Sequence, residues 1–402
     1  MASVTGPAKR FFFGRALRSE NIHSTLLPKR IALPVFASDA LSSNAYATQE
    51  ILLMLSVGGV ALYSFTPWVA LGVILVFFVV VASYRQNVRA YPSGGGDYEV
   101  VSTNLGERAG VFVASALMVD YVMTVAVSIS SAVANIASAF PPVGKQAVIV
   151  AVGLIVIMTL MNLRGVRESG TAFAIPTYGF IVGIFAMVAW GIWQISDGTI
   201  PQAESATWEI EAETTASGAL LIFLLARAFS SGTTALTGIE AIANGVPAFK
   251  KPKSKNAATT LLLLGVISMS MFAAITWLAM VTNVRVTEHN ENLVGLPPGQ
   301  EQKTVIAQVS QAIFSDFQPG YLYISIMTAL SLVLAANTAF NGFPVLGSVL
   351  ARDGYLPRQL HTRGDRLAFS NGIIFLAGAA TVLVIVYDAS VSSLIQLYVL
   401  GV

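Results

Sequence analysis

The stretch FASDALSSNAYATQE, residues 36–50, lies inside an otherwise apolar part of the chain. Its flanks, RIALPV and ILLMLSVGGVAL, are apolar enough to enter a lipid bilayer. Between them the stretch carries the acid Asp39 near its start, followed by a run of hydroxyl and amide side chains. A carboxylate at the bilayer centre costs about 2.5–3.5 kcal/mol on insertion scales, and acids retained there usually serve a function. The stretch therefore predicts a polar site embedded in a membrane.

The composition agrees with a membrane location. Of the 402 residues, 55% are hydrophobic and only 11% are charged, whereas soluble domains carry about 25% charged residues. The net charge of +2 does not suggest a nucleic-acid partner. The absence of cysteine excludes disulfides, thiolate nucleophiles and cysteine metal sites. We expect an all-α polytopic membrane protein in the lipid bilayer, neither an enzyme nor the holder of a cofactor.

Ten hydrophobic segments follow along the chain if about 20 residues make one crossing. They run over 32–56, 64–83, 109–139, 146–163, 172–194, 217–245, 258–282, 320–350, 370–387 and 391–402. The tenth stops at LIQLYVLGV without a polar end, so we expect the chain to be the front part of a longer protein. Residues 1–30 are predicted to be an N-terminal segment and residues 31–402 a transmembrane transporter domain.

The basic residues predict the orientation. Most of the 23 Lys and Arg residues fall in the N-terminal segment and in alternate loops on the same side, including KKPKSK at 250–255. The loops of the opposite side hold only Lys145, Arg285 and Lys303. Because basic residues accumulate in cytoplasmic loops, we expect a multi-pass protein of the cell membrane with its N-terminus in the cytoplasm.

A faint internal repeat links the first and sixth segments. FASDALSS at residue 36 recurs as FSSGTTALTG at residue 229, and the two copies begin on opposite sides of the membrane. Two five-segment halves of opposite topology are typical of inverted-repeat secondary transporters, in which the two corresponding helices are broken near mid-membrane. Small and hydroxyl residues in both copies suit unwound backbone that lines a cavity: Ser42, Ser43, Gly232 and Gly238.

The third segment carries an acid and hydroxyls at helical spacing. Asp120, Thr124 and Ser128 are four residues apart, so they share one stripe of a helix, with Tyr121 beside it. An acid and hydroxyls on one face form a row of oxygen ligands. Hydrogen bonding between helices is the alternative, and it suits Thr and Ser better than it suits Asp120.

The sixth segment holds a third intramembrane acid. Thr237 and Glu240 are one helical turn apart, just after the expected break. The alternatives are a near-interface Glu240 that reaches water and a structural ion pair between Asp39 and Arg227. Three acids with hydroxyls around them predict a site for a cation that prefers hard oxygen ligands.

At these residues the sequence resembles the KimA-type potassium importers, a KUP-related branch of the APC superfamily with the LeuT fold. The matching pieces are FASDALSSNAYATQE, DYVMTVAVS, FSSGTTALTGIEAIANGVP and ARDGYLPRQL. The resemblance implies potassium uptake together with protons, on a LeuT-like 5+5 inverted repeat with broken helices 1 and 6. It also implies a homodimer of the full-length protein, formed through a cytosolic C-terminal domain that this chain does not include.

The resemblance further implies a set of site residues. The expected potassium-binding residues are Asp39, Tyr46, Asp120, Tyr121, Thr124, Ser128, Thr237 and Tyr398. Glu240 matches the family as well, and burial in an apolar helix disfavours a charged carboxyl. We therefore expect Glu240 to be the proton-coupling group, with Asp120 as the next candidate.

Two other functions stay open. A proton-coupled amino-acid permease of the same superfamily would share the fold, but such permeases bind the substrate carboxylate at a Gly-rich break in helix 1. Here Asp39 occupies that region and would repel a carboxylate. A membrane sensor without transport is the other alternative, and it would need no repeated polar breaks.

Overall fold

The computed structural model describes residues 26–92, 96–164, 170–361 and 369–399, and most of its described residues are helical. Residues 1–25, most of the expected N-terminal segment, lie outside the described residues, as do the last three residues of the expected tenth segment. The α-helices are α2 (Lys29–Phe36), α3 (Ser38–Ser42), α4 (Asn44–Ser56), α5 (Thr66–Ala90), α6 (Gly96–Leu105), α7 (Glu107–Ala139), α8 (Ala147–Leu163), α9 (Gly170–Ser196), α10 (Gly218–Gly232), α11 (Glu240–Asn244), α12 (Lys253–Val281), α13 (Val305–Ile313), α14 (Gln318–Arg352), α15 (Ser370–Val386) and α16 (Val391–Tyr398). Short 3₁₀ turns are η2 (Val60–Phe65), η3 (Pro141–Gln146), η4 (Thr233–Leu236), η5 (Val246–Ala248), η6 (Asn290–Asn292) and η7 (Arg358–Leu360).

Within the described ranges, seven helical stretches are long and apolar enough to cross a membrane. They are Val60–Ala90, Glu107–Ala139, Pro141–Leu163, Ala174–Ser196, Gly218–Asn244, Lys253–Val281 and Gln318–Arg352. The other three expected segments form shorter helices. The segment 32–56 is divided into three pieces, 370–387 becomes the 17-residue helix α15, and 391–402 contains α16.

The first segment is interrupted at two single residues. Ala37 separates α2 from α3 with φ −108° and ψ 4°, which is not a helical conformation. Ser43 separates α3 from α4 but keeps a right-handed helical conformation. The interruption at Ala37 comes two residues before Asp39, so the change in chain direction falls close to the acid.

The sixth segment has a sharper break. Helix α10 is followed by η4, then Thr237 is extended with ψ 153°, and Gly238 adopts φ +79° before α11 begins at Glu240. Since residues with a Cβ rarely adopt a positive φ, glycine suits this position. The expectation that Ser42, Ser43 and Gly232 belong to unwound backbone is wrong, because all three are helical. A Cβ at Gly232 would meet Ile51 of α4 at 2.8 Å. Close helix packing, not unwinding, explains that glycine.

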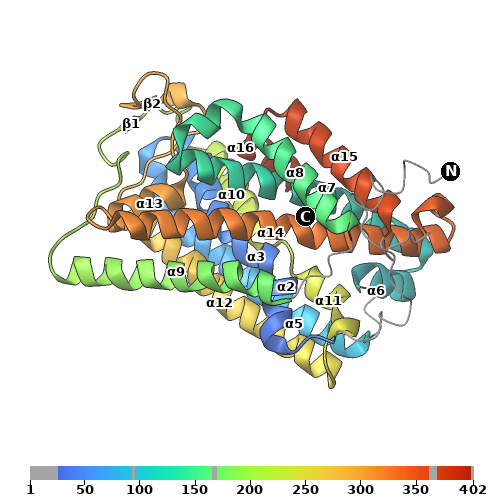
Figure 1. Cartoon of the computed structure of the whole chain (residues 1–402). Coiled ribbons are helices and arrows are strands. Elements are labelled where there is room, and N and C mark those ends of the chain that lie inside the picture. The colour runs from blue at the N-terminus through green and yellow to red at the C-terminus, as the bar shows by residue number, and fades with distance from the viewer. Residues whose placement is uncertain (1–25, 93–95, 165–169, 362–368, 400–402) are drawn as a thin grey trace, which may run out of the picture.

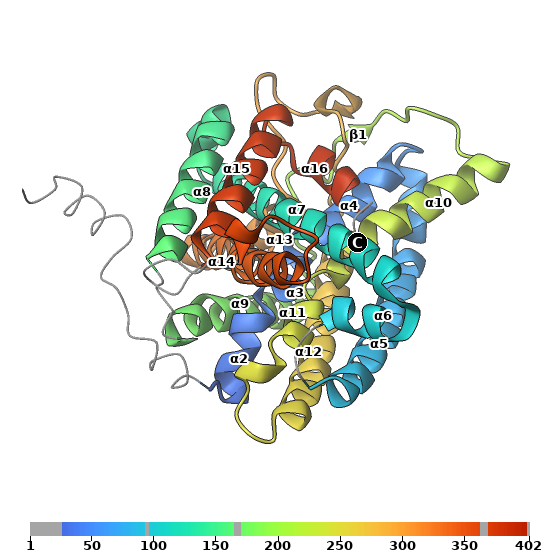
Figure 2. The ribbon, with the colours of Figure 1, turned by 90° about the vertical axis from the view of Figure 1, so that its right-hand side faces the viewer.

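The interrupted segments lie in the middle of the helix bundle. Figure 2 shows α3 and α11 near the centre, with α7, α14, α9 and α12 around them. The long helices α7 and α14 pack against each other, α3 packs against α14, and α16 packs against α7. Polar groups on α3 and α11 are therefore enclosed by long helices.

A two-stranded sheet joins two loops at one end of the bundle. Strand β1 (Glu209–Ile210) pairs antiparallel with β2 (Leu293–Val294), with Glu209 opposite Val294. In Figure 1 these loops lie at the upper left, whereas α6 and α11 lie toward the right-hand end. The bundle thus has one end covered by long loops and one end covered by the short helix α6.

Candidate ion-binding site

The predicted site residues come from five helices and from the break in the sixth segment. Those that are buried are Asp39, Tyr46, Asp120, Tyr121, Thr124, Ser128, Thr237 and Tyr398. Glu240, at the start of α11, is partly exposed. Polar side chains are buried in the bundle interior only when they bind something or each other, so their contacts decide what the site can do.

Ser43 connects the two interrupted segments. Its Oγ lies 2.9 Å from the Tyr46 hydroxyl and 2.9 Å from the Thr237 hydroxyl, and it also donates to the Asp39 carbonyl at 2.9 Å. Thr237 donates to the carbonyl of Thr234 at 3.1 Å. The structure therefore brings the predicted ligands Tyr46 and Thr237 together through a serine that the prediction did not include among the ligands.

Asp39 lies directly against the break in the sixth segment. A Cβ at Gly238 would sit 2.7 Å from Asp39 Cβ, 2.8 Å from its Oδ2 and 2.9 Å from the Ala40 amide nitrogen. Asp39 is 2% exposed, and its Oδ1 has no hydrogen-bond partner among the described residues. Gly238 thus allows the two chain segments to approach closely, and it leaves one carboxylate oxygen free to bind a ligand.

The acid and hydroxyls of the third segment share one continuous helix. Asp120, Thr124 and Ser128 are all buried in α7, as their spacing predicts. Thr124 Oγ1 lies 3.0 Å from the hydroxyl of Tyr398 in α16. Ser128 Oγ has no hydrogen-bond partner in the part of the chain that the structure describes. The expected ligand Tyr398 therefore joins the α7 stripe, and Ser128 offers an unused oxygen.

Tyr121 faces the other interrupted segment and the helix α14. Its hydroxyl accepts a hydrogen bond from Asn244 Nδ2 of α11 at 3.1 Å. A Cβ at Gly342 of α14 would lie 2.6 Å from the Tyr121 ring. Tyr121 is therefore fixed between α11 and α14, next to the α7 acid rather than in the Ser43 network.

Three carboxyl groups act on one another electrostatically. Glu240 acts on both Asp39 and Asp120, and Asp39 acts on Asp120. Among the described residues, none of the three forms an ion pair, and the suggested pair of Asp39 with Arg227 does not form. Buried carboxylates without a partner are costly. The arrangement therefore favours a cation, or protons, between these acids.

The acids do not converge on one point. In the ranges that the structure describes, no three His, Cys, Asp or Glu side chains are placed to hold a metal ion. Instead, carboxylates and the hydroxyls of serine, threonine and tyrosine are distributed around the breaks. Such mixed and flexible oxygen ligands suit a monovalent cation that gives up its water shell.

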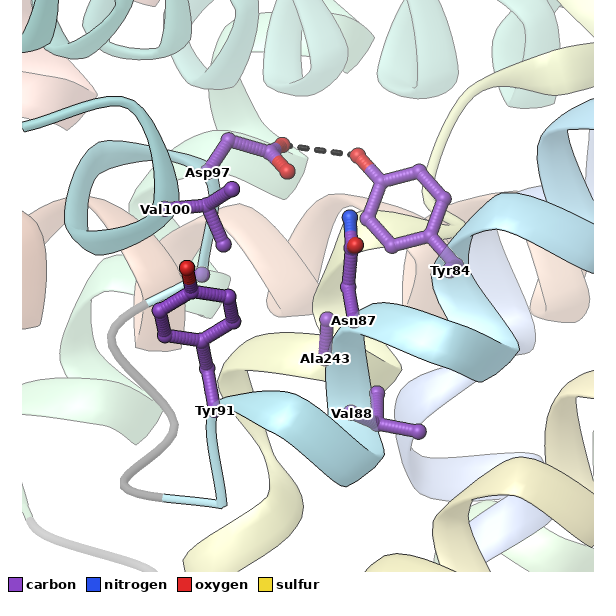
Figure 3. Close-up of a pocket in the computed structure, with 8 residues that line it drawn as sticks. Tyr84, Asn87, Val88, Tyr91, Asp97, Val100 and Ala243 are labelled. Atoms are coloured by element: carbon purple, nitrogen blue, oxygen red, sulfur yellow. Dashed lines mark hydrogen bonds between the residues drawn. The ribbon is translucent and has the colours of Figure 1, made fainter. Parts of the chain in front are cut away.

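A small pocket lies on the α6 side of this site. Figure 3 shows it between α5 and α6, with Tyr84 donating a 2.7 Å hydrogen bond to Asp97 Oδ2 and with Ala243 of α11 on its wall. Burial raises the pKa of the Asp97 carboxyl, and the bond from Tyr84 opposes that shift. A Cβ at Gly96 would collide with Asn244, the partner of Tyr121. Helix α6 therefore packs directly against α11 at this end of the bundle.

Sequence reasoning missed three polar residues. Ser43 was assigned only to unwound backbone, Asn244 was not singled out, and Glu50 was read as part of the opening stretch without a role. Asn244 was visible as a polar residue one helical turn after Glu240, and Glu50 as a fourth acid in an apolar helix, four residues after Tyr46. Their contacts depend on helices far away in the sequence.

Comparisons with known proteins identify the family and one relative of the chain. A family model described as "Amino acid permease" matches residues 33–402. The potassium transporter KimA of Bacillus subtilis (strain 168) is 42% identical over 394 residues, a match that covers 98% of this chain and 62% of the relative's length. This identity confirms the resemblance to KimA-type importers that the four motifs indicate.

Proposed function

The chain belongs to the amino acid permease family, and from that premise we propose that it carries potassium ions into the cell, coupled to protons, by alternating access. A multi-pass protein with a permease relative is a transporter and not an enzyme. One observation carries the choice of a cation: Asp39, Asp120 and Glu240 act on one another without an ion-pair partner among the described residues.

The charge pattern favours potassium over an amino acid as the substrate. The family description does not separate the two substrates, but the relative is named a potassium transporter. An amino acid would bring its carboxylate to the break in the first segment, where Asp39 would repel it. A potassium ion would instead replace its water with the carboxylate of Asp39 and the hydroxyls of Tyr46 and Thr237.

The two interrupted segments support a LeuT-like 5+5 inverted repeat. The breaks at Ala37 and Gly238 fall in the corresponding segments of the two expected halves, as in transporters whose substrate lies at the repeat interface. Rocking of one half against the other would then open the site to each side in turn. In the full-length protein, the resemblance suggests a homodimer.

A flux assay tests the proposal. The protein is reconstituted in liposomes and offered potassium, with rubidium as tracer, or a mixture of labelled amino acids, with and without an inward proton gradient. We expect potassium uptake that an inward proton gradient accelerates. Uptake of amino acids without potassium would favour the permease alternative, and the absence of any flux would favour the sensor.

The orientation can be tested by cysteine labelling, since the chain has no cysteine of its own. Lys255 and Glu291 are both exposed, at opposite ends of the bundle by the predicted topology. In intact cells, an impermeant thiol reagent should label Glu291→Cys and leave Lys255→Cys unlabelled until the cells are opened. Labelling of Lys255→Cys from outside would reverse the topology.

We assign the coupling of potassium uptake to protons to Glu240. Glu240→Gln imitates the protonated side chain, so we expect it to keep potassium exchange but lose the acceleration of net uptake by a proton gradient. The expected loss is about fivefold or more, the usual lower range for a coupling free energy. The measurement compares exchange and gradient-driven uptake in the same liposomes. A normal response to the gradient in Glu240→Gln would pass the role to Asp120.

A further inference from the structure

Glu50 is a buried acid outside the site described above. It lies in α4, one helical turn beyond Tyr46, and Glu288 of the β1–β2 loops acts on it. Its exposure is 0%, and neither carboxyl oxygen forms a hydrogen bond of normal geometry with a described residue. The residue therefore occupies the wall between those loops and the ion site.

The groups that face Glu50 do not neutralise a negative charge. Glu288, in the loop before β2, is close enough to act on Glu50, and so is the hydroxyl of Ser392 in α16. Gln396 of α16 donates to Glu288 Oε1 at 2.7 Å. On the neighbouring elements, Arg227 of α10 forms no ion pair with Glu50, and Arg285 instead donates to the carbonyl of Trp208. A charged Glu50 would thus be buried beside a second acid.

A proton suits this place better than a metal cation. A hard cation takes about six oxygen ligands, whereas Glu288 and Ser392 are the two side chains seen to act on Glu50 among the described residues. The adjacent polar side chains are engaged elsewhere, because Gln49 accepts from the Val305 amide at 3.0 Å and Thr48 pairs with Thr276 at 2.9 Å. A neutral carboxyl needs only one acceptor for its proton, far fewer partners than a cation requires.

We propose that Glu50 is a second proton-binding residue of the transporter, loaded from the loop side through Glu288. Each loading adds one proton to the Glu50 carboxylate and leaves the Glu288 carboxylate unchanged overall. The short helix α16 connects this pair to the ion site, because it contributes Gln396 to Glu288 and Tyr398 to Thr124. The role in coupling rests on the proposed function, whereas the proton on Glu50 does not.

Infrared spectroscopy tests the proton itself. The purified protein is compared with Glu50→Gln near neutral pH, in H₂O and in D₂O. We expect the difference spectrum to contain the carbonyl band of a protonated carboxylic acid, assigned to Glu50. The matched control Glu291→Gln, an exposed acid three residues after Glu288, should lack this band. The proposal would be overturned if the difference between the wild type and Glu50→Gln contained a carboxylate band in place of the acid band.

Potassium flux then tests the role of that proton. In liposomes we expect Glu50→Gln to exchange potassium like the wild type. The acceleration of its potassium uptake by acid on the loop side should be at least about fivefold smaller. Glu50→Asp, which keeps a titratable group, should restore part of the response, and Glu291→Gln should respond normally. A full response in Glu50→Gln removes the coupling role. A wild type that moves no potassium refutes the proposed function, and the infrared result still decides the proton site.

Discussion

Asp39→Asn and Asp120→Asn should each abolish potassium uptake while the protein still inserts and folds. Each change keeps the shape of the side chain and removes one negative charge from the candidate site. Two unit charges about 4 Å apart attract by roughly 4 kcal/mol at an effective dielectric constant of about 20. Even half of that energy would weaken potassium binding about 30-fold. Uptake at low potassium should therefore fall to background in both variants.

Thermal stability separates loss of binding from loss of folding. Because buried carboxylates without an ion-pair partner are costly, removing one charge should keep or raise the melting temperature in potassium-free buffer. A ligand that binds the folded state raises that temperature, so potassium should stabilise the wild type and not the variants, at matched ionic strength with choline. Wild-type uptake in both variants would place the ion elsewhere in the protein.

Gly238→Ala should inactivate the transporter as completely as loss of an acid. A Cβ there would meet Asp39 Cβ at 2.7 Å and the Ala40 nitrogen at 2.9 Å. The backbone at φ +79° adds strain of about 1–2 kcal/mol for a residue with a Cβ. Either Asp39 or the break in the sixth segment must move, and we expect uptake to fall to background together with a lower melting temperature.

Gly378→Ala is the matched control for that substitution. Gly378 lies in α15, where a Cβ would meet no atom within 4 Å. Alanine in a helix interior stabilises by about 0.5–1 kcal/mol relative to glycine, so this variant should transport normally and melt no earlier. Normal uptake by Gly238→Ala would show that the close approach to Asp39 is not needed for transport.

The sequence was sufficient to place most of the helices and the residues of α7. The four-residue spacing of Asp120, Thr124 and Ser128 describes one face of a helix, and α7 is continuous through all three. This works because the period of a helix is a local property of the chain. The sequence also predicted unwound backbone at Gly238, and there the structure has φ +79°.

Contacts between distant segments could not be predicted in this way. The pairing of Thr124 with Tyr398 joins residues 274 positions apart, and only the resemblance to a family suggested Tyr398. Gly232 was misread because a glycine that permits close helix packing looks the same in sequence as one in unwound backbone. The neighbours of Glu50 come from a loop and from α16, so its lack of a partner was visible only in three dimensions.

The Ser43 network has fewer protons than contacts. Ser43, Tyr46 and Thr237 carry one hydroxyl proton each, yet four oxygen pairs lie within 3.1 Å: Ser43 with Asp39 O, Tyr46 and Thr237, and Thr237 with Thr234 O. One of the four pairs therefore always lacks a hydrogen bond. Which pair lacks it changes when a hydroxyl rotates. Such rotations alone could turn the oxygen lone pairs of Tyr46 and Thr237 toward an arriving cation. The hydrogen bonds between the two interrupted segments can therefore rearrange around the cation before any helix moves.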